Sequence, residues 1–220
     1  MKKTINYYLK TFLLTVLVFG FIFETNAQEN QKSKKIVDSL ALKMFVDTNN
    51  RDYDAIVDMM HPKVFDLVSK DIMKSTMRSM FEGTEEFSID LPKQLPNYLI
   101  SEIYTEKSRS LEYAFVSYDL RMSMTFNEAE FDDEGKSMMK SMMQAKGMDI
   151  DFISDNTLKI LMKDRTTILM QDNDTNNKWV MINYDPDSPL TYQVLPTSLL
   201  EKAKEFQQNL MLKRKKKEED

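Results

Sequence analysis

Apolar residues recur at steps of three and four between residues 33 and 83, the spacing of helices that bury one face. The pattern predicts helices over 33–47, 53–60 and 62–83. Pro62 separates the last two, because proline suits the first turn of a helix and disfavours helical geometry in the residue before it. His61 is therefore expected at a junction between two helices.

After Gly83 the apolar residues alternate with polar ones, which is typical of strands with one buried face. Strands are predicted over 87–91, 98–106, 111–126, 157–171 and 179–185. In the strand 111–126 the apolar residues occupy odd positions up to Phe115 and even positions from Val116 onward. Because side chains alternate between faces, this change of phase predicts a β-bulge near 115–117 that bends the sheet.

Two further helices complete the pattern. One lies within 131–148, where Met138 and Met142, and also Met139 and Met143, stand four residues apart before Gly147. The other starts near residue 197 and is followed by a charged tail, 213–220, that is expected to be disordered. The predicted fold is thus α+β: N-terminal helices packed on a curved antiparallel sheet, with a Met-rich helical insertion and a C-terminal helix. Residues 28–212 are expected to form a single domain.

The first 27 residues have the organisation of a secretory signal peptide. Three lysines precede an apolar run over 12–23, and Ala27 precedes the expected cleavage point. The run of 12 residues is shorter than the roughly 20 that a membrane span needs, so a retained anchor is the weaker alternative. We therefore expect a periplasmic or secreted protein without a stable membrane anchor after cleavage.

Cleavage removes three of the 30 basic and one of the 35 acidic residues, which leaves 27 against 34 and a net charge of −7. An acidic exported protein is not expected to bind nucleic acid. The chain has no cysteine, which excludes disulfides, thiolate metal sites and cysteine nucleophiles. A single histidine excludes zinc sites built from two or three histidines, and catalysis by a serine–histidine pair would have to use His61.

No cofactor or metal is predicted, although two segments have features of metal sites. The thioethers of Met138–Met148 are soft ligands that could hold Cu(I), but methionine is also a flexible core filler. The segment 172–177 (DNDTNN) is similar to a calcium loop, yet it lacks the glycine at the sixth position and has Asn183 where a bidentate glutamate is needed. A hairpin turn is the favoured interpretation of that segment.

The order of elements, with AIVDMMHPKV (55–64) and NKWVMINYD (177–185), resembles the nuclear transport factor 2-like superfamily, in particular its small exported bacterial members. The resemblance covers 33–185 and implies a cone of three helices and a curved sheet around an interior pocket. That superfamily includes isomerases, hydratases, cyclases and members that only bind or scaffold. No position here matches an acid–base signature of the superfamily, so no catalytic residue is carried over.

Two residues are candidates for chemistry. His61 is either a general base or ligand at the mouth of the cone, or a junction residue bonded to backbone. If 157–171 is one regular strand, its even positions face inward, and Asp164 then points into an apolar interior where burial would raise its pKa. Such a carboxylate could act as a base or orient a ligand. Alternatively, KDR (163–165) is a tight turn or a bulge that leaves Asp164 in water.

The sequence favours an exported protein that binds a small apolar ligand or a partner protein. One alternative is a pocket enzyme of the isomerase or hydratase type with a carboxylate base, which requires a carboxylate or imidazole inside the cone. Another is a structural interaction module with an exposed apolar face, such as the Met-rich helix. The sequence predicts no oligomeric state.

Overall fold

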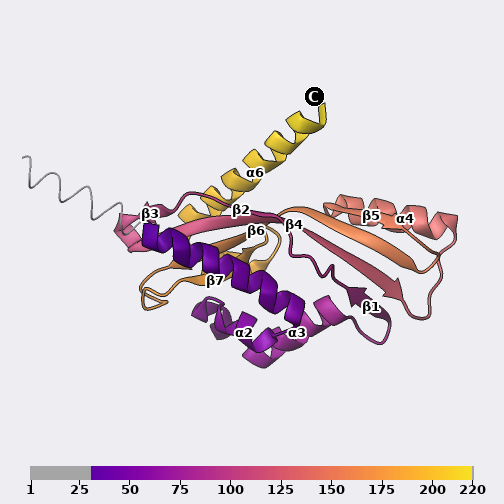
Figure 1. The fold of residues 1–220 in the computed structure, drawn as a ribbon, viewed down its shortest axis with the longest axis horizontal. Helices are drawn as coiled ribbons and strands as arrows, with labels where there is room; N and C mark the ends of the chain where they lie inside the picture. Colours follow the sequence, from indigo (N-terminus) through magenta and orange to yellow (C-terminus); the bar gives the residue numbers. More distant parts are fainter. Residues whose placement is uncertain (1–30, 220) are drawn as a thin grey trace, which may run out of the picture.

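The computed structural model describes residues 31–219, which form a seven-stranded antiparallel sheet with helices on both faces (Figure 1). The fold is α+β, as predicted. The expected signal peptide, 1–27, lies outside the described residues. Within 31–219, none of the helices combines the length and apolar character that a membrane span requires.

The described chain opens in a helix that ends at residue 50, here called the N-terminal helix. The helices that follow are α2 (Tyr53–Asp58), η1 (Pro62–Asp66), α3 (Lys70–Glu82), η2 (Lys107–Arg109), α4 (Asp133–Ala145), α5 (Pro189–Val194) and α6 (Thr197–Glu219). The strands are β1 (Phe87–Asp90), β2 (Tyr98–Ile100), β3 (Tyr104–Glu106), β4 (Leu111–Phe126), β5 (Met148–Phe152), β6 (Thr157–Gln171) and β7 (Val180–Tyr184).

The two long strands β4 and β6 pair along nearly their whole length and carry the other strands at their edges (Figure 1). Tyr118 pairs with Arg165 but Leu120 pairs with Met162, so two residues of β6 lie opposite one residue of β4. This is a β-bulge in β6, and its second residue, Asp164, has a positive φ of 52°. Aspartate tolerates this left-handed geometry better than most residues.

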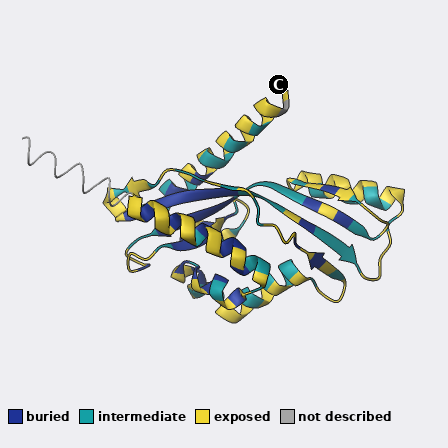
Figure 2. Ribbon diagram, in the orientation of Figure 1, coloured by how far each residue is buried: buried dark blue, intermediate teal, exposed yellow. Residues whose placement is uncertain are grey.

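The predicted bulge near 115–117 of β4 is wrong, because β4 stays in register with β6 as far as Tyr118. The change of phase has another cause. The first half of β4 is buried on both faces: Phe115 packs in a core with α6, while Val116 packs in a core with the N-terminal helix. Figure 2 shows this buried half of the sheet in dark blue. When a strand is buried on both faces, its apolar residues occupy odd and even positions alike, so the sequence does not show which face points to the core.

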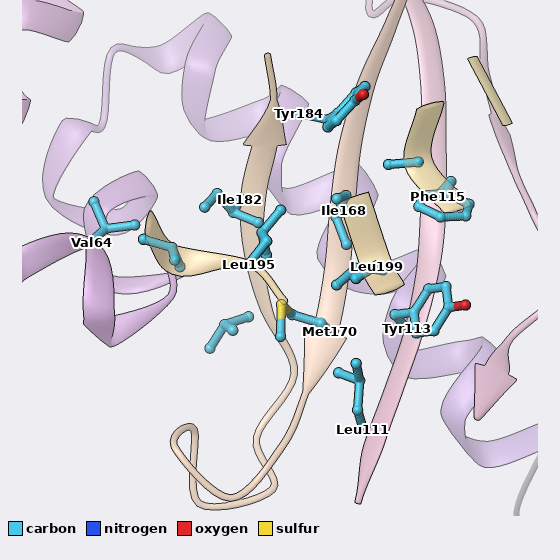
Figure 3. Packing of buried hydrophobic residues seen from close by; sticks show 13 residues of the cluster. Val64, Leu111, Tyr113, Phe115, Ile168, Met170, Ile182, Tyr184, Leu195 and Leu199 are labelled. Carbon is cyan, nitrogen blue, oxygen red and sulfur yellow. The ribbon is translucent and has the colours of Figure 1, made fainter. Parts of the chain in front are cut away.

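Each face of this half has its own core. On one face, Val37, Ala41 and Met44 of the N-terminal helix pack against Leu169 and Met181. On the other, Leu199 of α6 packs against a group from β4, β6 and β7 that Figure 3 shows together, including Phe115, Ile168 and Ile182. The ring of Phe206, two turns further along α6, stacks on Phe115 at a centroid distance of 4.7 Å.

Several predicted boundaries need correction. The third helix is two elements, η1 and α3, because Ser69 caps a new helix by accepting a hydrogen bond from the N–H of Ile72. The predicted strand 98–106 is divided into β2 and β3, and the strand β5 was not predicted. The tail 213–220 was expected to be disordered, whereas α6 runs on through Glu219.

The Met-rich insertion is helical, as predicted, and forms α4. Its two methionine pairs differ in environment. Met139 and Met143 pack on a core under β1, β5 and the ends of β4 and β6, whereas Met138 and Met142 are 61% and 53% exposed.

Candidate functional site

Two adjacent cavities lie between the N-terminal helix and β4, with volumes of about 250 Å³ and about 80 Å³. Both are lined by Phe45, Thr48 and Leu120, so these three residues form the wall between them. We call the larger the outer cavity, the smaller the inner cavity, and the two together the helix–sheet pocket.

The outer cavity exists because the edge of β4 is open there. Along this edge β2 ends its pairing at Tyr118 and β1 begins its pairing at Ser123, so in the described chain residues 119–122 have no strand partner on that side. The segment 91–97 crosses the gap, and Asn49 Nδ2 fixes it to the N-terminal helix by donating to the carbonyl oxygen of Lys93 at 3.2 Å. The outer cavity is lined by Phe45, Thr48, Asn49, Leu91, Pro92, Gln94, Leu95, Pro96, Asn97, Asp119, Leu120 and Arg121.

The inner cavity is predominantly apolar. Its lining comprises Met44, Phe45, Thr48, Ile56, Met60, Met77, Phe81, Tyr118, Leu120, Met181, Ile182 and Asn183. None of these described lining residues is an aspartate, glutamate, histidine, lysine or arginine. The polar groups are partly satisfied already: Thr48 Oγ1 donates to the carbonyl oxygen of Met44, and Asn183 Oδ1 accepts from Thr167 Oγ1 at 2.8 Å. Flexible thioether side chains suit a cavity that adapts to an apolar ligand.

Asp164 does not line either cavity among the described residues, and the bulge is the reason. Before the bulge the even positions of β6, such as Ile160, pack with β1 and α4; after it, even positions such as Ile168 face α6. Of the two alternatives for Asp164, the regular strand with one inward-facing parity is therefore wrong, and the bulge within 163–165 is found. The Asp164 side chain is 14% exposed and is bound by Arg214 of α6, so it is neither free in an apolar interior nor left in water.

Arg214 binds a second carboxylate in the same cluster. Its Nη1 and Nη2 donate to Asp119 at 3.2 and 2.7 Å, while the backbone N–H of Asp164 donates to Asp119 Oδ1 at 3.1 Å. Burial alone would raise the pKa of Asp119, but these hydrogen bonds and the positive charge of Arg214 hold that pKa below its usual value. Asp119 therefore stays ionised and paired where it lines the outer cavity.

His61 lies at the predicted junction and is 1% exposed. Its Nδ1 accepts from the N–H of Lys63 at 3.2 Å and caps η1, while its backbone N–H donates to the carbonyl oxygen of Met181 at 3.0 Å. Because Nδ1 is an acceptor, the neutral ring carries its proton on Nε2, which is 3.6 Å from Asp172 Oδ2. Burial lowers the pKa of His61 despite the opposing charge of Asp172.

His61 is thus a neutral, shielded group at the helix junction, bound to β7 through its backbone, and its Nε2 forms no hydrogen bond within the described residues. It lines neither cavity of the helix–sheet pocket in the described structure. The pair with Asp172 has the composition of an acid–base dyad, but Nδ1 is occupied by backbone and the ring has almost no contact with solvent.

The segment 172–177 forms the loop between β6 and β7, in line with the predicted turn. Asp172 Oδ1 accepts from the N–H of Thr175, and Asn176 and Asn177 adopt positive φ angles that asparagine tolerates. Lys63 pairs with Asp174 at 2.6 Å and ties this loop to η1. Within residues 31–219 no group of three histidine, cysteine or acidic side chains is placed to hold a metal ion.

Comparison of the chain with protein-family models, with curated proteins and with solved structures finds no match. The site must therefore be interpreted from its own geometry.

Sequence reasoning missed three charged residues around the outer cavity: Asp119, Arg121 and Arg214. A signal for Arg214 was present. One face of the helix continues into the basic segment, because four residues stand at helical spacing: Leu199, Ala203, Leu210 and Arg214. This spacing would have predicted that Arg214 lies on the packed face of α6.

Proposed function

We propose that this protein binds a small, largely apolar ligand in the helix–sheet pocket. The observation that carries the proposal is the inner cavity, a space of about 80 Å³ beside Thr48 whose lining is apolar apart from a few hydrogen-bonding groups. Ligand sites of this kind are concave and mostly apolar, with a few polar groups that fix orientation. The outer cavity provides the entrance, since its wall is the open edge of β4.

Binding is favoured over catalysis because the described residues that line the pocket include no available acid–base group. The one carboxylate among them, Asp119, already accepts hydrogen bonds from Arg214 and from the backbone of Asp164. His61 lies outside the lining with Nδ1 engaged. An isomerase or hydratase that uses a carboxylate base needs such a group within hydrogen-bonding reach of its substrate.

We also propose that the chain is exported and related to the nuclear transport factor 2-like superfamily. Export is supported by the composition of residues 1–27, and the relationship by the order of helices and strands together with the pocket between them.

The test blocks the pocket from one side. Thr48→Phe places a ring at the wall shared by both cavities, and Val46→Phe adds the same ring on the exposed face of the same helix. Decan-1-ol is titrated into each protein by calorimetry. We expect saturable binding with a negative heat-capacity change for the wild type and for Val46→Phe, and affinity at least about tenfold weaker for Thr48→Phe.

Two results would contradict the proposal. One is the absence of saturable decan-1-ol binding by the wild type. The other is equal affinity in the Thr48→Phe and Val46→Phe variants, which would place the alcohol elsewhere on the molecule.

A further inference from the structure

One cation at the outer cavity has no hydrogen-bonded partner. Of the described residues that line this cavity, only Asp119 and Arg121 are charged. The oxygens of Asp119 already accept hydrogen bonds from Arg214, which Asp119 shares with Asp164. Arg121 is exposed and forms no ion pair or side-chain hydrogen bond with any other residue in 31–219. The mouth of the helix–sheet pocket therefore presents one guanidinium whose charge acts on Asp119 but whose N–H groups donate no hydrogen bond within the described residues.

Two polar donors also line this cavity. Gln94 and Asn97 belong to the crossing segment 91–97, and their exposed side-chain amides form no hydrogen bond within the described chain. Together with Arg121 they offer N–H donors at the mouth, whereas the inner cavity offers apolar contact. The pocket thus has hydrogen-bond donors, including a guanidinium, at its entrance and is apolar at its end.

We infer that the ligand is an amphiphile with an anionic headgroup, specifically an aliphatic monocarboxylate whose chain enters the inner cavity past Thr48 and whose carboxylate binds at Arg121. This inference rests on the proposed function and adds the chemical class of ligand to it. Guanidinium and carboxylate have matching planar geometries that allow two parallel hydrogen bonds. An alcohol of equal chain length would gain the apolar contact without the ion pair.

The experiment compares chain length and headgroup on the full protein. Calorimetric affinities are measured for hexanoate, octanoate, decanoate, decan-1-ol and decyltrimethylammonium at low and high salt. We expect affinity to rise about fourfold for each methylene until the cavity is filled. Decanoate should bind more tightly than decan-1-ol, and added salt should reduce that advantage.

The variant Arg121→Gln removes the guanidinium, and Arg109→Gln makes the same change in the turn before β4, away from the pocket. For decanoate, Arg121→Gln should weaken binding about three- to tenfold, between the effects of an exposed ion pair and a charge-assisted hydrogen bond. Arg109→Gln should have no effect on decanoate. Decan-1-ol affinity should be the same in all three proteins.

The outcomes separate the two claims. If neither decanoate nor decan-1-ol binds, the proposed function fails. The proposal of a ligand pocket survives, but the inference of an anionic headgroup is wrong, in either of two cases. One is equal affinity for decanoate and decan-1-ol, and the other is unchanged decanoate affinity in Arg121→Gln. Tighter binding of decyltrimethylammonium than of decanoate would also overturn it.

Discussion

Arg214 of α6 binds both carboxylate oxygens of Asp164 in β6, with Nε–Oδ2 at 3.0 Å and Nη2–Oδ1 at 2.8 Å. The same guanidinium holds Asp119 in β4, opposite the bulge. One cation near the end of α6 therefore ties the C-terminal helix to both long strands where the sheet is irregular. Since Asp119 lines the outer cavity, this contact also fixes one wall of the helix–sheet pocket.

Removing the cation should leave two carboxylates facing each other without compensation. We expect Arg214→Ala to lower the free energy of unfolding by about 1–3 kcal/mol, the range for hydrogen bonds to charged groups at a partly buried site. Urea unfolding at neutral pH measures the change. The neighbouring Lys213→Ala, on an exposed side chain, is the matched control and should cost less than about 0.5 kcal/mol.

A second variant tests the mechanism of that loss. Adding Asp119→Asn to Arg214→Ala removes the repulsion between Asp119 and Asp164, so the double variant should be more stable than Arg214→Ala alone. Equal stability of Arg214→Ala and Lys213→Ala would show that the ion-pair cluster does not stabilise the fold.

The buried imidazole gives a pH dependence of known sign. The pKa of His61 in the folded protein is below its ordinary value of 6.5, mainly because of burial. Around pH 6 the unfolded chain therefore binds more protons than the folded chain, and stability present above about pH 6.5 is lost as the pH falls toward the folded-state pKa. Urea midpoints between pH 5 and pH 8 should show this decline.

His61 is the only histidine, so His61→Gln is a clean control for the same curve. The variant should lose about 1–2 kcal/mol at pH 7.5, the scale of one hydrogen bond in a buried site, and its stability should be nearly flat from pH 7.5 to pH 6. A decline of equal size in the variant would assign the pH effect to other groups.

Export has a direct chemical signature. If residues 1–27 are a cleaved signal peptide, the native protein should begin at Gln28, which can cyclise to pyroglutamate. Intact-mass and N-terminal peptide mass spectrometry of protein from its native host would show this. Recovery of a soluble protein that begins at Met1 would contradict the proposal.

The helical junction was predictable because proline acts locally. Pro62 restricts its own backbone and that of His61, so the break between α2 and η1 could be placed from two residues. Glycine acted in the same way at Gly83, which follows α3 with a φ of 100°. Strand alternation also located most of the sheet, because one-sided burial leaves a period of two in the sequence.

The site could not be predicted because it depends on contacts between distant residues. Arg214 and Asp119 are 95 positions apart, and nothing local to either indicates the other. A bulge at 163–165 was one of the alternatives for Asp164, but the local pattern could not choose among them. The separate bulge predicted near 115–117 is wrong, since two-sided burial of β4 imitates a change of phase. The gap between β1 and β2 that forms the outer cavity depends on where pairing stops, which hydrophobic pattern does not encode.

Methionine methyl NMR tests the central claim, that the helix–sheet pocket is a ligand site, most directly. The 18 methionines serve as internal probes once their ε-methyl groups carry carbon-13 and the lining residues are assigned by Met→Leu substitution. Met44, Met60, Met77 and Met181 line the inner cavity, whereas Met138 and Met142 are exposed on α4. On addition of decan-1-ol we expect saturable shifts of the four lining methyls and none of the two on α4. Unchanged lining methyls at saturating alcohol, or shifts confined to Met138 and Met142, would contradict the account.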